Sequence, residues 1–169
     1  MFVYKKNLLA NSGRVLMRFP VQTTITISVG DSCEFYGDAK TVTEDAGSGA
    51  SLGIIESFEK ANGSPLTSNG ASGDFTCTVT TTDSTSVYAV VDVSRNSVYS
   101  VACSNTLGTT TGSDMPGYTM DAVAGGTTLD EATALTTTGT YMSLGPDPDP
   151  SAPDNSVLCV LYESDLWNL

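Results

Sequence analysis

Short runs of β-branched and aromatic residues, separated by clusters of Gly, Asn, Asp, Ser and Pro, recur along almost the whole chain and constrain its fold most strongly. Such runs form strands, because their side chains pack well on a pleated surface and the intervening residues suit turns. We expect strands at 21–29, 32–36, 40–43, 52–59, 75–81, 86–93, 97–103, 117–123, 140–144 and 156–163. The pattern predicts an all-β fold, either a single β-barrel or a β-sandwich domain.

The residue patterns of two of these segments predict which of their faces are buried. The segment 156–163 is apolar on both faces, which favours a central strand or one whose second face meets another subunit. The segment 86–93 alternates, which is typical of a half-buried strand. Its inward positions are expected to be Val87, Ala89, Val91 and Val93, and its outward positions Tyr88, Val90 and Asp92.

Local turn signals add two expectations. The dipeptide Arg95-Asn96 between two good strands predicts a tight hairpin. A helical pattern survives only at 128–135, where Thr128 is a candidate N-cap and Glu131 completes a capping box.

The chain of 169 residues fits one domain with extensions at both ends. We expect an extended N-terminal arm at 1–22, a β-barrel or β-sandwich domain at 23–165 and a C-terminal tail at 166–169. Apolar side chains in both ends lack strand or helix periodicity, so we expect them to dock on a partner by strand addition or in a groove. The alternative is that the ends cap their own domain. The apolar candidates are Phe2, Tyr4, Leu8, Leu9, Leu16 and Phe19 in the arm, and Leu166 and Trp167 in the tail as a weaker oligomer interface.

Charge separates the arm from the rest of the chain. Lys5, Lys6, Arg14 and Arg18 are its basic residues, whereas residues 31–169 hold 19 acids and 3 bases. This asymmetry can steer the arm onto an acidic surface, including that of another copy. The acidic body is not expected to bind nucleic acid, which requires clustered Lys and Arg.

The sequence also bears on the compartment in which the protein is found. No run of about 18 apolar residues occurs, so no membrane span is expected, and the N-terminus lacks the features of a signal peptide. The four cysteines are far apart and form no CxxC pair. We interpret Cys77 and Cys103 as small hydrophobic residues on buried strand faces. Cysteines that are not expected to form disulfides favour a reducing compartment.

The sequence contains no histidine, which removes Ser-His-Asp, Cys-His and His-metal chemistry. Residues 49–53 match the G-x-S-x-G motif, but that motif needs a strand-turn-helix setting and a histidine base, so we interpret the match as chance. A hydrolase with paired carboxylates remains open, although a solvated acidic surface is favoured. We expect a protein that is not an enzyme and needs no cofactor.

One loop could bind a hard cation. Asp147, Asp149, Ser151 and Asp154 offer oxygen ligands, although four prolines restrict how the loop can wrap. We expect no metal there.

The order of strands and turns resembles the small β-barrel decoration, or cement, proteins of tailed bacteriophages. The resemblance covers about residues 25–165 and is a pattern of turns and strands. It is carried by Gly30-Asp31, Gly53-Ile54-Ile55, the turn Asn62-Gly63-Ser64-Pro65-Leu66, and Gly117-Tyr118 with Asp121.

The resemblance implies a structural virion protein without an active site, made in the cytoplasm of the host bacterium. It implies binding to the major capsid protein on the outer surface of the shell, where the protein, as a homotrimer or less often a dimer, stabilises the shell against the pressure of packaged DNA. Within that frame, the apolar arm residues would fill grooves on the capsid, and the four basic arm residues would pair with capsid carboxylates.

A carbohydrate-binding β-sandwich on a virion or cell surface is the competing hypothesis. It would need exposed aromatic residues clustered on loops, and the candidates near turns are Tyr36, Tyr118 and Tyr141.

Overall fold

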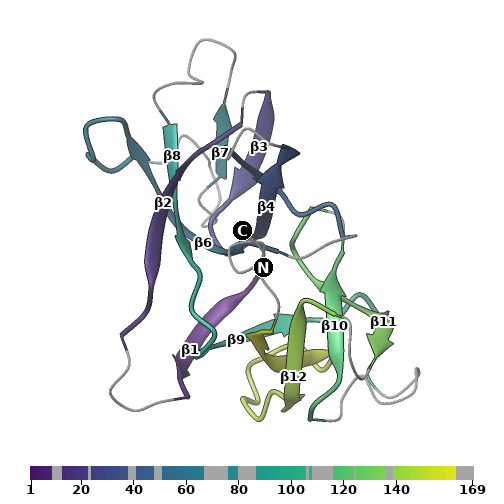
Figure 1. The fold of residues 1–169 in the computed structure, drawn as a ribbon. Helices are drawn as coiled ribbons and strands as arrows, with labels where there is room; N and C mark the ends of the chain where they lie inside the picture. The colour runs from purple at the N-terminus through teal and green to yellow at the C-terminus, as the bar shows by residue number, and fades with distance from the viewer. Residues whose placement is uncertain are drawn as a thin grey trace.

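The computed structural model describes residues 1–8, 13–22, 24–37, 41–47, 51–66, 76–79, 87–105, 107, 116–123, 125–135 and 139–162. Across these residues the secondary structure consists of β-strands joined by turns, without an α-helix. The expected all-β fold is therefore confirmed. Figure 1 shows the strands in two groups, one above the other, with the chain passing between them several times.

The lower group in Figure 1 is a six-stranded antiparallel sheet. Its order is β1 (Val3–Asn7), β9 (Ser97–Ala102), β13 (Ser156–Leu161), β12 (Tyr141–Pro146), β10 (Thr119–Ala122) and β11 (Leu129–Leu135). An isolated parallel bridge joins Cys103, just after β9, to Leu129 at the start of β11. The sheet is therefore strongly curled, because strands far apart in its order meet again at this bridge.

The upper group holds a five-stranded sheet in the order β2 (Leu16–Pro20), β8 (Val87–Asp92), β6 (Gly53–Lys60), β4 (Ser32–Tyr36) and β5 (Thr41–Glu44). A parallel bridge joins Val21, just after β2, to Val42 in β5, and the Gln22 N–H donates to the Val42 carbonyl at 2.9 Å. The two outermost strands of this sheet thus approach each other. The pair β3 (Ile25–Ser28) and β7 (Thr76–Val79) completes the group.

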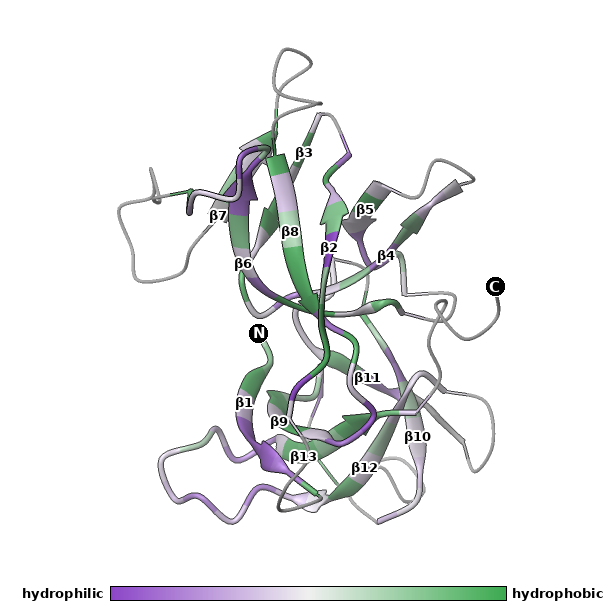
Figure 2. Ribbon diagram, turned by 60° about the vertical axis from the view of Figure 1, so that its left-hand side comes forward, coloured by the Kyte–Doolittle hydropathy of each residue, from purple (hydrophilic) through white to green (hydrophobic). Residues whose placement is uncertain are grey.

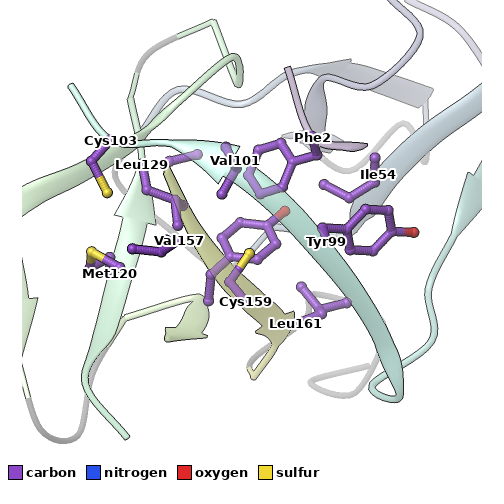
Figure 3. Close-up of a cluster of buried hydrophobic side chains, with 12 residues drawn as sticks. Phe2, Ile54, Tyr99, Val101, Cys103, Met120, Leu129, Val157, Cys159 and Leu161 are labelled. Carbon is purple, nitrogen blue, oxygen red and sulfur yellow. The ribbon is translucent and has the colours of Figure 1, made fainter. Parts of the chain in front are cut away.

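Each group of strands encloses its own apolar cluster. The lower cluster, seen in Figure 3, consists of Phe2, Ile54, Tyr99, Val101, Cys103, Met120, Ala122, Leu129, Tyr141, Val157, Cys159 and Leu161. The upper cluster consists of Val21, Ile27, Cys33, Val42, Leu52, Ile55, Phe58, Val79, Val87, Ala89, Val91 and Val93. Neighbouring residues of β6 serve both cores, because Ile54 belongs to the lower cluster and Ile55 to the upper.

Several expectations about burial are confirmed. The strand β13 lies inside the six-stranded sheet, between β9 and β12, as its two apolar faces predict. Cys103 is buried and Cys77 is half-buried, and all four cysteines are free thiols. Burial raises the pKa of the Cys103 thiol to about 12, so this group stays protonated at neutral pH.

Two local predictions are wrong. The turn at Arg95-Asn96 does not close a hairpin, because β8 belongs to the five-stranded sheet and β9 to the six-stranded sheet. Residues 129–135 form the strand β11 and not a helical turn. Pairing with β10 outweighs the capping signal there, and Glu131 is buried, where it accepts hydrogen bonds from the Ser104 hydroxyl and the Asn105 N–H at 3.0 Å each.

A buried polar cluster fastens the two groups of strands together. The Ser32 hydroxyl lies 2.7 Å from the Asp45 carboxylate and 2.6 Å from the Tyr141 hydroxyl, and Ser51 also donates to Asp45. Ser32 is on β4 and Tyr141 is on β12, so this cluster joins the upper sheet to the lower. The Ser32 N–H also donates to the carbonyl of Gly126 at 2.8 Å.

Candidate docking surface on the N-terminal strands

The described residues of the N-terminal segment, 1–8 and 13–22, contribute one strand to each of the two sheets, which differs from the expected extended arm. The strand β1 pairs with β9, with Val3 opposite Ser100 and Asn7 opposite Ser97. The strand β2 pairs with β8 along its whole length. Each is the outermost strand of its sheet, β1 of the lower and β2 of the upper (Figure 1). The structure therefore corresponds to the alternative in which the N-terminal end caps its own domain.

The two aromatic residues Phe2 and Phe19 point into the protein. Phe2 is only 3% exposed, its ring centroid lies 4.8 Å from that of Tyr141, and Figure 3 shows it within the lower cluster. Its N–H donates to the Gly30 carbonyl at 2.6 Å. Phe19 is half-buried and packs edge-on against Phe35, with ring centroids 5.4 Å apart. Phe2 was expected to contact a capsid groove, but it fills the protein's own core instead.

Seven other large apolar side chains of this segment face solvent. Among the described residues, seven of the nine exposed large hydrophobic side chains lie within the first 17 positions, and Val15 is 53% exposed. Isolated exposed hydrophobic residues are ordinary, but a concentration of them in one segment is typical of an interaction site. We call them the N-terminal apolar surface: Met1, Val3, Tyr4, Leu8, Val15, Leu16 and Met17. They lie on or beside β1 and β2; in Figure 2, β2 runs down through the upper group and β1 lies in the lower group.

Lys5 forms ion pairs within the chain. Its Nζ lies 3.1 Å from Asp149 and 3.5 Å from Asp147, in the loop considered above as a cation site. Hydrogen bonds from Ser151, and then the Lys5 ammonium, lower the pKa of Asp149 to about 2. The described residues hold no group of three or more His, Cys, Asp or Glu side chains suited to a metal ion. In this structure the positive charge beside the two carboxylates is the ammonium group of Lys5.

Arg14 lies where the two sheets meet. Its Nε donates to the Asp92 carboxylate at 2.7 Å, and its guanidinium forms an ion pair with Glu56 and lies 4.3 Å from the ring centroid of Tyr4. A further hydrogen bond of 3.3 Å links Arg14 to the Tyr99 hydroxyl. Burial alone would lower the pKa of Arg14, but the hydrogen bonds to Glu56 and Asp92 outweigh it and raise the pKa above its usual value.

Asp92 is the buried partner in this ion pair and is only 1% exposed. It accepts hydrogen bonds from the Ser94 N–H at 2.9 Å, the Ser97 hydroxyl at 2.7 Å and the Tyr99 hydroxyl at 2.5 Å, in addition to Arg14. Burial opposes its ionisation, but these hydrogen bonds together hold its pKa below the usual value. The sequence prediction placed Asp92 on the outer face of its strand, which is wrong, because its carboxylate is buried and accepts hydrogen bonds from Ser97 and Tyr99 of β9 in the other sheet.

Arg18 also binds its own chain. Its Nε lies 3.2 Å from Glu59, its Nη2 donates to the Lys60 carbonyl at 2.6 Å, and its guanidinium lies 3.8 Å from the ring centroid of Tyr88. Lys6 is exposed and, among the described residues, forms no ion pair. Of the four basic residues expected to pair with capsid carboxylates, three therefore pair with carboxylates of this chain.

Other candidates from the sequence do not come together in one site. Tyr36 is exposed, Tyr118 is half-buried and Tyr141 is fully buried, so these three tyrosines form no exposed aromatic cluster. The serine of the G-x-S-x-G motif, Ser51, is buried against Asp45 and precedes a strand. Leu9, Leu166 and Trp167 lie outside the described residues. The described part of the chain also contains no helix of the length and hydrophobicity that a membrane span requires.

The Arg14–Asp92 cluster was missed at the level of sequence. Its members lie at 14, 56, 92 and 99, and no local spacing links them. The one available signal was the aspartate at the end of an apolar strand, followed closely by Ser94 and Ser97, which is a pattern that can satisfy a buried carboxylate.

A scan against protein-family models found no match to this chain, and a search of curated proteins found no similar sequence.

Proposed function

We propose that this chain is a structural protein of a tailed bacteriophage that binds the outer surface of the major capsid shell and stabilises it against DNA packaging pressure. The observation that carries the proposal is the concentration of exposed apolar side chains on β1 and β2. Burying such side chains against a partner yields about 1.5 to 3 kcal/mol for each large one. The resemblance of residues 25–165 to capsid decoration proteins supplies the identity of the partner.

The binding element in this proposal is a folded surface. Because β1 and β2 are already ordered in their sheets, docking costs less conformational entropy than the folding of a free arm would. Lys5, Arg14 and Arg18 are engaged within the chain, so they contribute little to attraction toward the shell. Binding should therefore depend mainly on apolar contact and only weakly on salt.

The remainder of the molecule suits an outward-facing role. The net formal charge of −12 lets like-charge repulsion keep decorated particles apart. Many copies, each making a modest contact, would hold neighbouring capsid subunits together through avidity. We propose a homotrimer, or otherwise a dimer, on the shell.

Point substitutions test this proposal better than removal of the segment. A chain without residues 1–22 would lose Phe2 from its core and Arg14 from Asp92, so a loss of binding could reflect unfolding. Leu16→Asp places a charge on the N-terminal apolar surface at an exposed position. Tyr36→Asp is the matched control, because Tyr36 is equally exposed but lies on β4.

The assay is cosedimentation with undecorated capsids at low and high salt. Wild type and Tyr36→Asp should bind saturably, while Leu16→Asp should lose at least about tenfold in affinity, the equivalent of burying one leucine. Absence of binding by the wild-type protein, or an equal loss in both variants, would reject the proposal. Circular dichroism of each variant confirms that the fold is intact.

A further inference from the structure

We propose that the N-terminal segment, residues 1–22, exchanges between copies of this chain, so that β1 and β2 of one copy complete the two sheets of another. This inference concerns the free protein and does not depend on the capsid as a partner. It rests on the pairing of the two strands, on what the body would lack without them, on charge complementarity and on a strained connection.

The pairing of the segment allows it to leave as a unit. Within the described ranges, β1 pairs with β9 and β2 pairs with β8, and each is the outermost strand in the order of its sheet. Its departure therefore breaks no pairing between two strands of the body, apart from releasing the single bridge from Val21 to Val42. Terminal strands attached in this way are suited to exchange between identical chains.

The body cannot remain stable with these positions empty. Loss of Phe2 would leave a hole among Tyr99, Tyr141 and their neighbours, and loss of Arg14 would leave the buried Asp92 without its cation. Buried charges without a partner are strongly destabilising. A segment that leaves must be replaced, and the segment of a second copy carries the same side chains in the same order.

Charge complementarity favours that occupant. The segment brings Lys5, Arg14 and Arg18, and the body receives them at the acids Asp147, Asp149, Glu56, Asp92 and Glu59. The rest of the surface is acidic, so two bodies repel one another unless a basic segment lies between them. A second copy supplies both the acidic site and the basic segment.

The connection between the segment and the body is strained. Thr24 has a φ of 66°, and it is the one non-glycine residue with positive φ in the described part of the chain. For a β-branched residue this conformation is strained, because its side chain crowds the backbone at positive φ. In the closed chain the Thr24 N–H donates to the Val79 carbonyl at 2.8 Å, which holds the turn. Exchange would let the connection extend and release the strain, a condition that favours swapping.

An isotope-mixing experiment on the full chain tests the exchange. Unlabelled and ¹⁵N-labelled proteins are mixed, refolded together at high concentration and treated with a carbodiimide. The reagent activates a carboxylate, which then forms an amide with a nearby amine, while the carbodiimide takes up the elements of water and leaves as a urea. The chosen pair is Lys5 and Asp149, whose charged atoms lie 3.1 Å apart, so this cross-link forms whether the segment sits on its own body or on another.

Mass spectrometry then separates the two arrangements. A Lys5–Asp149 peptide with one light and one heavy half arises only when the segment and the body belong to different chains. The expected mixed fraction clearly exceeds that of cross-links from the exposed Lys60, which report random encounters, and approaches one half for complete exchange. A Lys5–Asp149 cross-link that forms but stays at the Lys60 level would overturn the proposal.

Variants at the connection give a second measurement. Thr24→Gly relieves the strain in the closed chain, because glycine adopts positive φ freely, and should lower the mixed fraction several-fold. Thr26→Gly is the matched control, because Thr26 is exposed on β3 and its φ is not positive. An equal mixed fraction in the two variants would refute the role of the strained connection.

Discussion

At the scale of single residues, the Asp92 carboxylate connects parts of the chain that are far apart in sequence. It receives hydrogen bonds from Arg14 ahead of β2 and from Ser94 after β8. Ser97 and Tyr99 of β9, in the six-stranded sheet, donate to it as well. A carboxylate with so many donors stays ionised although it is buried. Through Arg14, this carboxylate is one of the groups that hold the N-terminal segment on the body.

This arrangement predicts loss of stability in acid. The folded-state pKa of Asp92 lies below its usual value, so its contribution is complete above the unfolded-state pKa and disappears as the pH falls through the folded-state pKa. The free energy of unfolding should therefore fall from about pH 5 downward. Urea denaturation of wild type and Asp92→Asn at pH 7 and at pH 3 measures this, and the variant should be less stable at pH 7 and less sensitive to acid.

Asp31 provides the control of opposite sign. Burial raises its pKa, so its contribution is present at low pH and is lost as the pH rises through the folded-state pKa. Asp31→Asn should therefore make the loss of stability in acid steeper than in wild type. An identical pH dependence in wild type and Asp92→Asn would show that the Asp92 cluster is not the acid-sensitive element.

At the scale of elements, the N-terminal strands carry most of the exposed apolar side chains, while their neighbours reach the cores. Phe2, just before β1, lies in the lower cluster and Phe19 of β2 packs against the upper cluster, whereas Val3, Leu16 and Met17 face solvent. Burial in the cores and exposure to solvent thus fall on different residues of the same segment. The pairing with β9 and β8 explains how the exposed side chains are held in place without a hydrophobic partner of their own.

Substitutions of the buried Phe2 and of the exposed Val3 beside it should differ in their effect on stability. Phe2→Ala should lower the free energy of unfolding by about 3 kcal/mol, because it empties a buried aromatic site. The adjacent exposed Val3→Ala should change it by less than about 0.5 kcal/mol. Thermal and urea denaturation test both, and equal small effects would mean that Phe2 does not occupy the lower core in solution.

At the scale of the whole molecule, two curled groups of strands are joined by buried polar contacts and by repeated crossings of the chain. The loop between β10 and β11 reaches from the lower group to Ser32 on β4, and Gly126 makes that contact. Gly126 has a φ of 67°, and a Cβ at this position would overlap the Ser32 backbone. The close approach of the two groups therefore requires glycine there.

A comparison of alanine substitutions at Gly125 and Gly126 separates the effect of close approach from that of backbone conformation. Gly125 also has a positive φ, of 94°, but a Cβ there would lie 3.8 Å from its nearest neighbour, Glu44. Gly125→Ala should cost about 1 kcal/mol for the backbone conformation alone. Gly126→Ala should destabilise the protein further, because the two groups of strands must also move apart. Differential scanning calorimetry of the two variants tests this, and equal melting temperatures would contradict the close contact.

The sequence patterns correctly predicted those features of the fold that depend on neighbouring residues. The all-β class, the inward alternation of Val87, Ala89 and Val91, and the interior position of β13 all follow from residue type and period. Where two non-local partners decide the outcome, the same patterns were wrong. The turn at 95–96 resembles a hairpin although it joins two sheets, and 129–135 has a capping signal although it pairs with β10.

The sequence by itself determined the strand-forming character of this protein, its acidic surface and its lack of histidine chemistry, because these depend on composition and short-range periodicity. Only the tertiary structure decided the fate of the N-terminal segment. Its charge and apolar residues are equally compatible with a free arm and with two docked strands. The choice rests on the positions of Asp92, Asp149 and the edges of β9 and β8, which long-range folding brings together.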